Sequence, residues 1–327
     1  MRKTYAYQYL NRPEETIEWE KRWTELDPED DRPASVIEEC REDIADREKA
    51  GGKDGDEHGS TGTDGESSAE EDSDTGRFIV FALQSKPAFD QARFWQDLKA
   101  DWGLERSDEP DEDDDEHDDR LVFNIGNTMM TVALMPGRIP HEEAERAAGF
   151  NFFWKEGVEV ARAHTAHILV AIINSDLDLI ERGKLFVKVV SSVLKQPCVT
   201  AVHLPGVVYS PEMYIEEAQS MRNDELPVSD WVWCGLERVE NGVSCYTDGM
   251  KLFGKHEMEI FVRAEDLEKT DLSEAMQFMR NTIYYVLDND VTFVDGDTIG
   301  VSETDVRVLK LSRGLVLSDE ETFKIPL

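Results

Sequence analysis

FIVFALQ, at residues 78–84, is a nearly continuous run of apolar side chains, and it predicts a buried β-strand. An apolar stripe over residues 86–104 predicts a helix directly after this strand. Two apolar segments then flank the dipeptide GN at 126–127, which is the pattern of a β-hairpin. A helix over 142–164 and a second buried strand over 167–174 follow. This part of the chain therefore has the order βαββαβ.

The βαββαβ order is typical of the split βαβ, or ferredoxin-like, sandwich. We expect this sandwich between about residues 77 and 175. Helices over 179–195 and 273–287, with strands between and after them, predict a second, looser α/β sandwich half over residues 176–327. Asp271 precedes the last helix as a predicted N-cap. The predicted fold class is therefore α+β.

The chain has 327 residues and a formal net charge of −36, from 71 acidic and 35 basic side chains. Residues 1–76 hold 24 acidic and 10 basic side chains, and residues 101–120 hold 12 acidic and 2 basic ones. Most of the excess negative charge therefore lies outside the apolar segments. A chain of this charge has no basic face for nucleic acid or for an anionic membrane surface. We expect neither as a partner.

Three regions follow from this composition. Residues 1–50 predict a weakly helical extension, in which Trp19 and Trp23 share a helix face and are candidates for contact with a partner. Residues 51–76 contain no aromatic and no branched aliphatic side chain, so they predict an acidic disordered linker. Residues 77–327 form the predicted α+β domain, into which the acidic loop 105–120 is inserted.

The cellular compartment is predicted from absences in the sequence. The N-terminus has no long apolar segment of the kind that signal peptides contain, and no run approaches 18 apolar residues. The four cysteines form no CxxC pair. We therefore expect a cytoplasmic protein with reduced thiols.

Four segments together resemble a known family. They are MTVALMPGRIP at 130–140, HTAHILVAI at 164–172, CYTDGMKLFGKHEMEI at 245–260 and YYVLDNDVTFVDGDTIG at 284–300. As a set they resemble the bacterial domain of unknown function 4261 family, over about residues 78–315. His141 stands where that family usually has an aromatic residue. The resemblance implies a bacterial protein and hints at an immunity-type or secretion-linked setting, but it implies no reaction.

The segment DGDTIG at 295–300 places two carboxylates, Asp295 and Asp297, on alternate positions beside Thr298. Such carboxylates are candidates for binding a ligand or activating water. The same pattern also suits a tight turn, in which Asp side chains accept backbone N–H groups and Gly adopts a positive φ. Both interpretations remain open at the level of sequence.

His164 and His167 form an HxxH pair where a predicted helix meets a predicted strand. A zinc site needs three or four ligands, and the other His and Cys residues are scattered along the chain. The simpler interpretation places His164 at a helix C-terminus, where a histidine interacts favourably with the helix dipole. We expect no metal and no cofactor.

The chain contains neither GxSxG nor HExxH, so two common hydrolase signatures are missing. The leading prediction is a non-enzymatic protein-interaction or immunity-type module, with Asp113, Asp114 and Asp115 as candidates for contact with a partner. One alternative is a hydrolase or metal-dependent enzyme that uses Asp295 and Asp297. A second alternative is an acidic mimic of nucleic acid that captures a nucleic-acid-binding protein.

Overall fold

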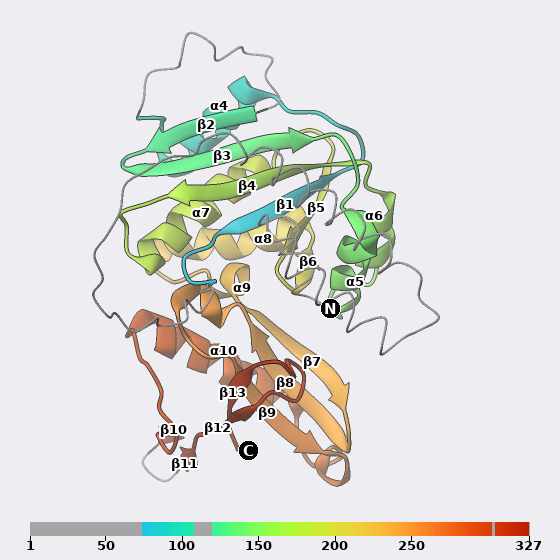
Figure 1. Ribbon diagram of the computed structural model, residues 1–327, viewed down its shortest axis with the longest axis vertical. Coiled ribbons are helices and arrows are strands. Elements are labelled where there is room, and N and C mark those ends of the chain that lie inside the picture. The colour runs from blue at the N-terminus through green and yellow to red at the C-terminus, as the bar shows by residue number, and fades with distance from the viewer. Residues whose placement is uncertain (1–73, 108–119, 303–304, 327) are drawn as a thin grey trace, which may run out of the picture. The chain divides into compact units, whose positions relative to one another are not determined.

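The computed structural model in Figure 1 describes residues 74–107, 120–302 and 305–326. Several predictions fall outside these residues: the helical extension 1–50 with Trp19 and Trp23, most of the linker 51–76, and the acidic side chains Asp113, Asp114 and Asp115. In the described part of the chain, no helix is both long and apolar enough to cross a membrane.

The first sheet has six strands in the order β2-β3-β4-β1-β5-β6, and every neighbouring pair is antiparallel (Figure 1). Its strands are β1 (Ile79–Gln84), β2 (Arg120–Ile125), β3 (Thr128–Met135), β4 (Ala166–Asn174), β5 (Val199–Leu204) and β6 (Val207–Tyr209). The predicted hairpin at 126–127 is confirmed, because it joins β2 to β3.

The central strand β1 is buried on both faces, as its apolar sequence predicts. Val80 and Ala82 contact one hydrophobic core, whereas Phe81 and Leu83 contact a second one on the opposite face. Side chains of α4 (Gln91–Trp102) and α7 (Leu179–Val193) complete the first core. Side chains of α5 (Glu143–Gly149) and α6 (Gly157–Ala163) complete the second. Helices therefore cover both faces of the sheet at β1.

The predicted ferredoxin-like arrangement needs correction. A split βαβ unit places one strand between two strands that a helix joins. Here β3 and β4 are joined by α5 and α6 and yet are direct antiparallel neighbours. The predicted helix 142–164 is in fact two short helices, separated by residues 150–156, in which the Asn151 side chain donates to Val208 O (2.9 Å) and accepts from Phe153 N (3.1 Å). After these two helices the chain enters β4, which pairs with β3 in antiparallel orientation.

The second sheet has the order β12-β13-β9-β8-β7, and α10 (Leu272–Asp288) contacts β7 and β8. The predicted N-cap is confirmed, because the Asp271 side chain accepts from Ser273 N (2.8 Å). β13 pairs in parallel with β9 and was not identified from the sequence. The strands of this sheet are β7 (Trp233–Val239), β8 (Gly242–Asp248), β9 (Met258–Arg263), β12 (Lys310–Arg313) and β13 (Glu321–Lys324).

Short elements complete the chain. The helices α8 (Pro211–Ala218) and α9 (Val228–Trp231) lie between the two sheets in sequence, and β10 (Thr298–Ser302) pairs with β11 (Asp305–Val308). The hydrophobic core that contains Val80 and Ala82 of β1 also includes Phe253 and Ile260. The two sheets therefore share this core. The mixed α+β class is therefore confirmed. The described residues also form the 3-10 helices η1 (Pro140–Glu142), η2 (Gln219–Asn223), η3 (Met250–Phe253) and η4 (Ala264–Asp266).

Candidate functional site

Three histidines gather on the face of the first sheet that α5 and α6 cover. His167 of β4 and His203 of β5 flank Phe81 of β1, with ring centroids 5.5 Å and 5.9 Å from the phenyl ring. Glu143, the first residue of α5, places Oε1 3.8 Å from His203 Nε2. His164 follows α6 and lies near enough to His203 to influence its pKa. We call His164, His167, His203 and Glu143 the histidine cluster.

Hydrogen bonds show that His164 is neutral. Its Nε2 accepts from Ile139 N (2.8 Å), and its Nδ1 therefore carries the proton that it donates to Ala161 O. Protonating Nε2 would break the bond from Ile139. Burial also lowers the pKa of His164. His164 is the C-cap of α6, and its neutral ring donates to Ala161 O in the last turn of that helix, so it interacts with the helix C-terminus by a hydrogen bond and not by charge. Through Ile139 it also holds the start of η1 against the end of α6.

The other members of the histidine cluster are also shifted towards their neutral forms. Burial lowers the pKa of His167, whose Nδ1 donates to Gly137 O (3.0 Å). Burial lowers the pKa of His203 to about 4 and raises that of Glu143 to about 7. Such shifts are typical of functional sites and also of buried structural networks. His164, His167 and His203 are each at most 5% exposed, so a substrate does not reach their rings in this conformation.

The histidine cluster predicts two opposite pH dependences. Because the pKa of His203 is lowered on folding, this histidine decreases the unfolding free energy of the protein as the pH falls from 6.5 towards 4. Because the pKa of Glu143 is raised on folding, this carboxyl group decreases the unfolding free energy of the protein as the pH rises from 4.5 towards 7. Relative to the wild-type protein, His203→Phe should therefore gain about 2 kcal/mol of unfolding free energy between pH 7 and pH 5, and Glu143→Gln should lose about 2 kcal/mol.

Urea unfolding of both variants at the two pH values measures this difference directly. The exposed variant Glu265→Gln serves as the control and should show no such change. Equal pH responses in His203→Phe, Glu143→Gln and the wild-type protein would contradict the assigned protonation states.

Asp297 accepts a hydrogen bond from its own turn, whereas Asp295 accepts one from the distant strand β12. Asp297 Oδ2 accepts from Val294 N (2.8 Å), and Asp295 Oδ1 accepts from Leu311 N (2.7 Å). Gly296 between them has a φ of 91°, which favours glycine. Thr298 begins β10 and is exposed. The Asp297 bond and the φ of Gly296 fit the turn interpretation, and the Asp295 bond joins this turn to β12.

The sequence-predicted site residues do not converge. In the described ranges, no hydrogen bond or ion pair links Asp295 or Asp297 to His164 or His167. Among the same residues, no group of three or more His, Cys, Asp or Glu side chains is placed to hold a metal ion. Sequence reasoning did not single out Glu143 and treated His203 as isolated. The signal for His203 was its alternation with Ala201 on a predicted strand, which places both on one face.

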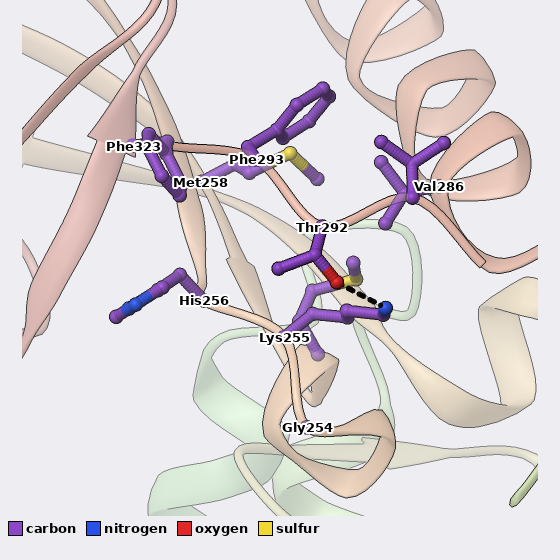
Figure 2. A pocket seen from close by; sticks show the side chains of 10 residues that line it. Gly254, Lys255, His256, Met258, Val286, Thr292, Phe293 and Phe323 are labelled. Carbon is purple, nitrogen blue, oxygen red and sulfur yellow. Dashed lines mark hydrogen bonds between the residues drawn. The ribbon is translucent and has the colours of Figure 1, made fainter. Parts of the chain in front are cut away.

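A pocket lies between β9, β13 and the end of α10 (Figure 2). Lys255 Nζ donates to Thr292 Oγ1 (2.9 Å) and pairs with Asp290 Oδ1 (2.7 Å), so its charge is already neutralised. The Phe323 ring lies 5.5 Å from that of His256. The wall is otherwise apolar, and the pocket therefore offers a ligand little that is polar and unpaired. Its lining residues are Met250, Gly254, Lys255, His256, Met258, Val286, Val291, Thr292, Phe293 and Phe323.

The first sheet also has an exposed apolar region. On the face that carries His167, the side chains of Val122, Met129, Met135 and Ile173 are between 37% and 54% exposed. The helices α5 and α6 contact β5 and β6, and among the described residues the side chains of Val122 on β2 and Met129 and Met135 on β3 are exposed on this side. We call these four residues the open sheet face. Large apolar side chains grouped on adjacent strands are typical of a binding surface.

Comparison with known proteins gives one match. Residues 246–325 match the family model described as Domain of unknown function (DUF4261). The predicted resemblance is thereby confirmed for the later part of the chain, which includes most of the segments 245–260 and 284–300. All the residues that line the pocket also lie within the match. No curated protein and no solved structure matches this chain.

Proposed function

We propose that this protein is a non-enzymatic interaction module that binds a basic protein on the open sheet face. The observation that carries the proposal is the exposure of Val122, Met129 and Ile173 near one end of three adjacent strands, with Met135 exposed towards the other end of β3. The opposite face of the same strands is covered, since Leu121, Met130 and Val170 lie in the hydrophobic core. Methionine side chains adapt readily to different partners, which suits a binding surface.

The position of β2 supports this assignment. β2 is the outermost strand of the first sheet, so only one of its edges pairs with another strand of that sheet. An extended segment of a partner can add to such an edge by backbone hydrogen bonds. Val122 lies on β2 and would then contribute a side chain beside the added strand.

Charge determines the kind of partner. The segment 109–119 contains nine acidic side chains and directly precedes Arg120, where β2 begins. Because this acidic segment directly precedes β2 in the sequence, a basic partner is the kind that its charge favours. Opposite charges of this kind accelerate association and exclude acidic partners.

A photo-crosslinking amino acid placed at selected positions in the full chain tests the proposal. Crosslinkers at Val122 and Ile173 should capture the same basic protein, identified by mass spectrometry, in the cells of origin. A crosslinker at Tyr285, which is 49% exposed on α10, is the matched control and should not capture it. Capture of a second copy of this chain, of an acidic protein, or of the same proteins from all three positions would contradict the proposal.

Charge introduced on the open sheet face should abolish binding without unfolding the protein. The double variant Val122→Asp, Ile173→Asp should bind the captured partner at least about tenfold more weakly, because buried apolar anchors dominate interface energies. Both side chains are exposed, so each change should alter the unfolding free energy by about 0.5 kcal/mol or less. Binding and urea unfolding are measured on the same samples. Unchanged affinity in a folded double variant would contradict the assignment.

A further inference from the structure

Two cysteines of the second sheet lie side by side. Cys234 on β7 and Cys245 on β8 place their sulfur atoms 3.6 Å apart, and both are free thiols. Cys245 is fully buried in the hydrophobic core, whereas Cys234 is only half-buried. The pair is therefore reachable from solvent through Cys234.

The register of β7 and β8 explains this contact. Cys234 pairs with Thr247, and Leu236 pairs with Cys245. Residues opposite each other in an antiparallel pair project to the same face, and residues two apart along a strand share that face. Cys234 and Cys245 are therefore diagonal neighbours on one face. The disulfide distance is about 2.05 Å, so the two sulfurs need to approach by about 1.5 Å. Diagonal neighbours in an antiparallel pair lie about 7–8 Å apart, so closing the bond requires β7 and β8 to move closer together as well as side-chain rotation.

We propose that Cys234 and Cys245 form a dithiol site at which a hydroperoxide such as hydrogen peroxide produces an intramolecular disulfide. The Cys234 sulfur attacks one oxygen of the peroxide and breaks the O–O bond, giving a sulfenic acid, and the released hydroxide takes the thiol proton to form water. The Cys245 sulfur then attacks the Cys234 sulfur. The S–O bond breaks as the S–S bond forms, and hydroxide leaves with the Cys245 proton as a second water.

The order of the two steps follows from the environments of the sulfurs. The hydrogen bond with Cys234 and the burial of Cys245 both raise the pKa of the Cys245 thiol. Cys245 therefore remains a protonated thiol inside the core and is not the first to react. Cys234 is the more exposed partner and meets the oxidant, and Cys245, 3.6 Å away, passes its proton to the leaving oxygen as it attacks the sulfenic acid. The two waters and the disulfide account for every atom of the two thiols and the peroxide.

Peptide mapping of the full chain tests this site. The reduced protein is treated with hydrogen peroxide, quenched with iodoacetamide and digested without reductant. A linked peptide containing Cys234 and Cys245 should form, and dithiothreitol should remove it. Cys198 is the matched control, because it is also half-buried, and Cys198→Ala should leave the linked peptide unchanged. Cys245→Ala should accumulate Cys234 sulfenic acid, which dimedone traps.

Several outcomes would overturn the proposal. One is a wild-type protein in which Cys234 proceeds to the sulfinic acid with no linked peptide. Another is a native protein in which peroxide modifies Cys198 while Cys234 stays available to iodoacetamide. Cys245→Ala removes a core sulfur, so its folding is checked by circular dichroism. If that variant does not fold, the wild-type peptide map and the Cys198→Ala control still decide whether the disulfide forms.

Discussion

Glu259→Ala is expected to lower the unfolding free energy by about 3–5 kcal/mol, because it removes one partner of a buried ion pair. Glu259 lies on β9 and is fully buried. Its carboxylate accepts from Leu315 N (2.9 Å) and Val316 N (2.9 Å) and pairs with Lys324 Nζ (2.8 Å). The side chain therefore joins β9 to β13 and to the loop before it. The alanine variant leaves the charge of Lys324 and these backbone groups without their acceptor.

The pKa of Glu259 supports this expectation. Burial alone would raise it, but Lys324 and the two backbone donors lower it below its usual value. A carboxyl group with a lowered pKa in the folded state contributes stability above its unfolded pKa and loses it as the pH falls. The stability difference between wild type and Glu259→Ala should therefore be largest near neutral pH and should shrink below about pH 4.

Urea unfolding at pH 7 and pH 4 measures this difference. Glu259→Gln keeps one carbonyl acceptor and should be less destabilised than Glu259→Ala. Glu265→Gln changes an exposed carboxylate on the neighbouring η4 and serves as the control. A loss of less than about 1 kcal/mol for Glu259→Ala, the range of an exposed ion pair, would show that the contacts are not those described.

Asp230→Asn is expected to have the opposite effect and to stabilise the protein by about 1–3 kcal/mol at pH 8. Asp230 on α9 is 4% exposed, and neither oxygen of its carboxyl group has a hydrogen-bond partner among the described residues. Burial raises its pKa well above the usual range, the nearby Glu217 raises it further, and Arg280 lowers it. Folding therefore favours the protonated form of Asp230.

The sign of the pH dependence separates this effect from a change in packing. A carboxyl group with a raised pKa in the folded state causes stability to fall as the pH rises above its unfolded pKa of about 3.9. Asparagine has nearly the same shape and no charge at any of these pH values. The advantage of Asp230→Asn over the wild-type protein should therefore grow between pH 5 and pH 8.

Thermal and urea unfolding at these two pH values provide the measurement. Asp224→Asn replaces an exposed carboxylate and is the matched control. It should change the unfolding free energy by no more than about 0.5 kcal/mol at either pH. A destabilised Asp230→Asn variant at pH 8 would mean that the carboxylate is ionised and paired in the folded protein.

The elements were predictable from sequence wherever their signal is local. The strand β1, the hairpin between β2 and β3, and the N-cap Asp271 each depend on a few consecutive residues, and all three are confirmed. The long helix 142–164 was mispredicted for the opposite reason. Its interruption depends on the Asn151 bond to Val208, a residue on a distant strand.

The candidate sites were less predictable, because their members are far apart in sequence. The His203–Glu143 contact joins β5 to α5, and the Cys234–Cys245 contact depends on a register that no single strand specifies. The Asp295 and Asp297 pair is the exception, since a turn was one of the two interpretations of DGDTIG. The exposure of the open sheet face could not be predicted from the sequence either, because the alternation along β2 does not show which face of the sheet the helices cover.

The sequence by itself determined the α+β class, the central buried strand, the segregation of negative charge and the family resemblance that the match at 246–325 confirms. These properties follow from composition and from periodicity over short distances. Only the tertiary structure decided the strand order β2-β3-β4-β1-β5-β6, the neutral histidine cluster and the exposed apolar face. The physical reason is that strand order, burial and the resulting pKa shifts depend on which distant segments exclude water from one another.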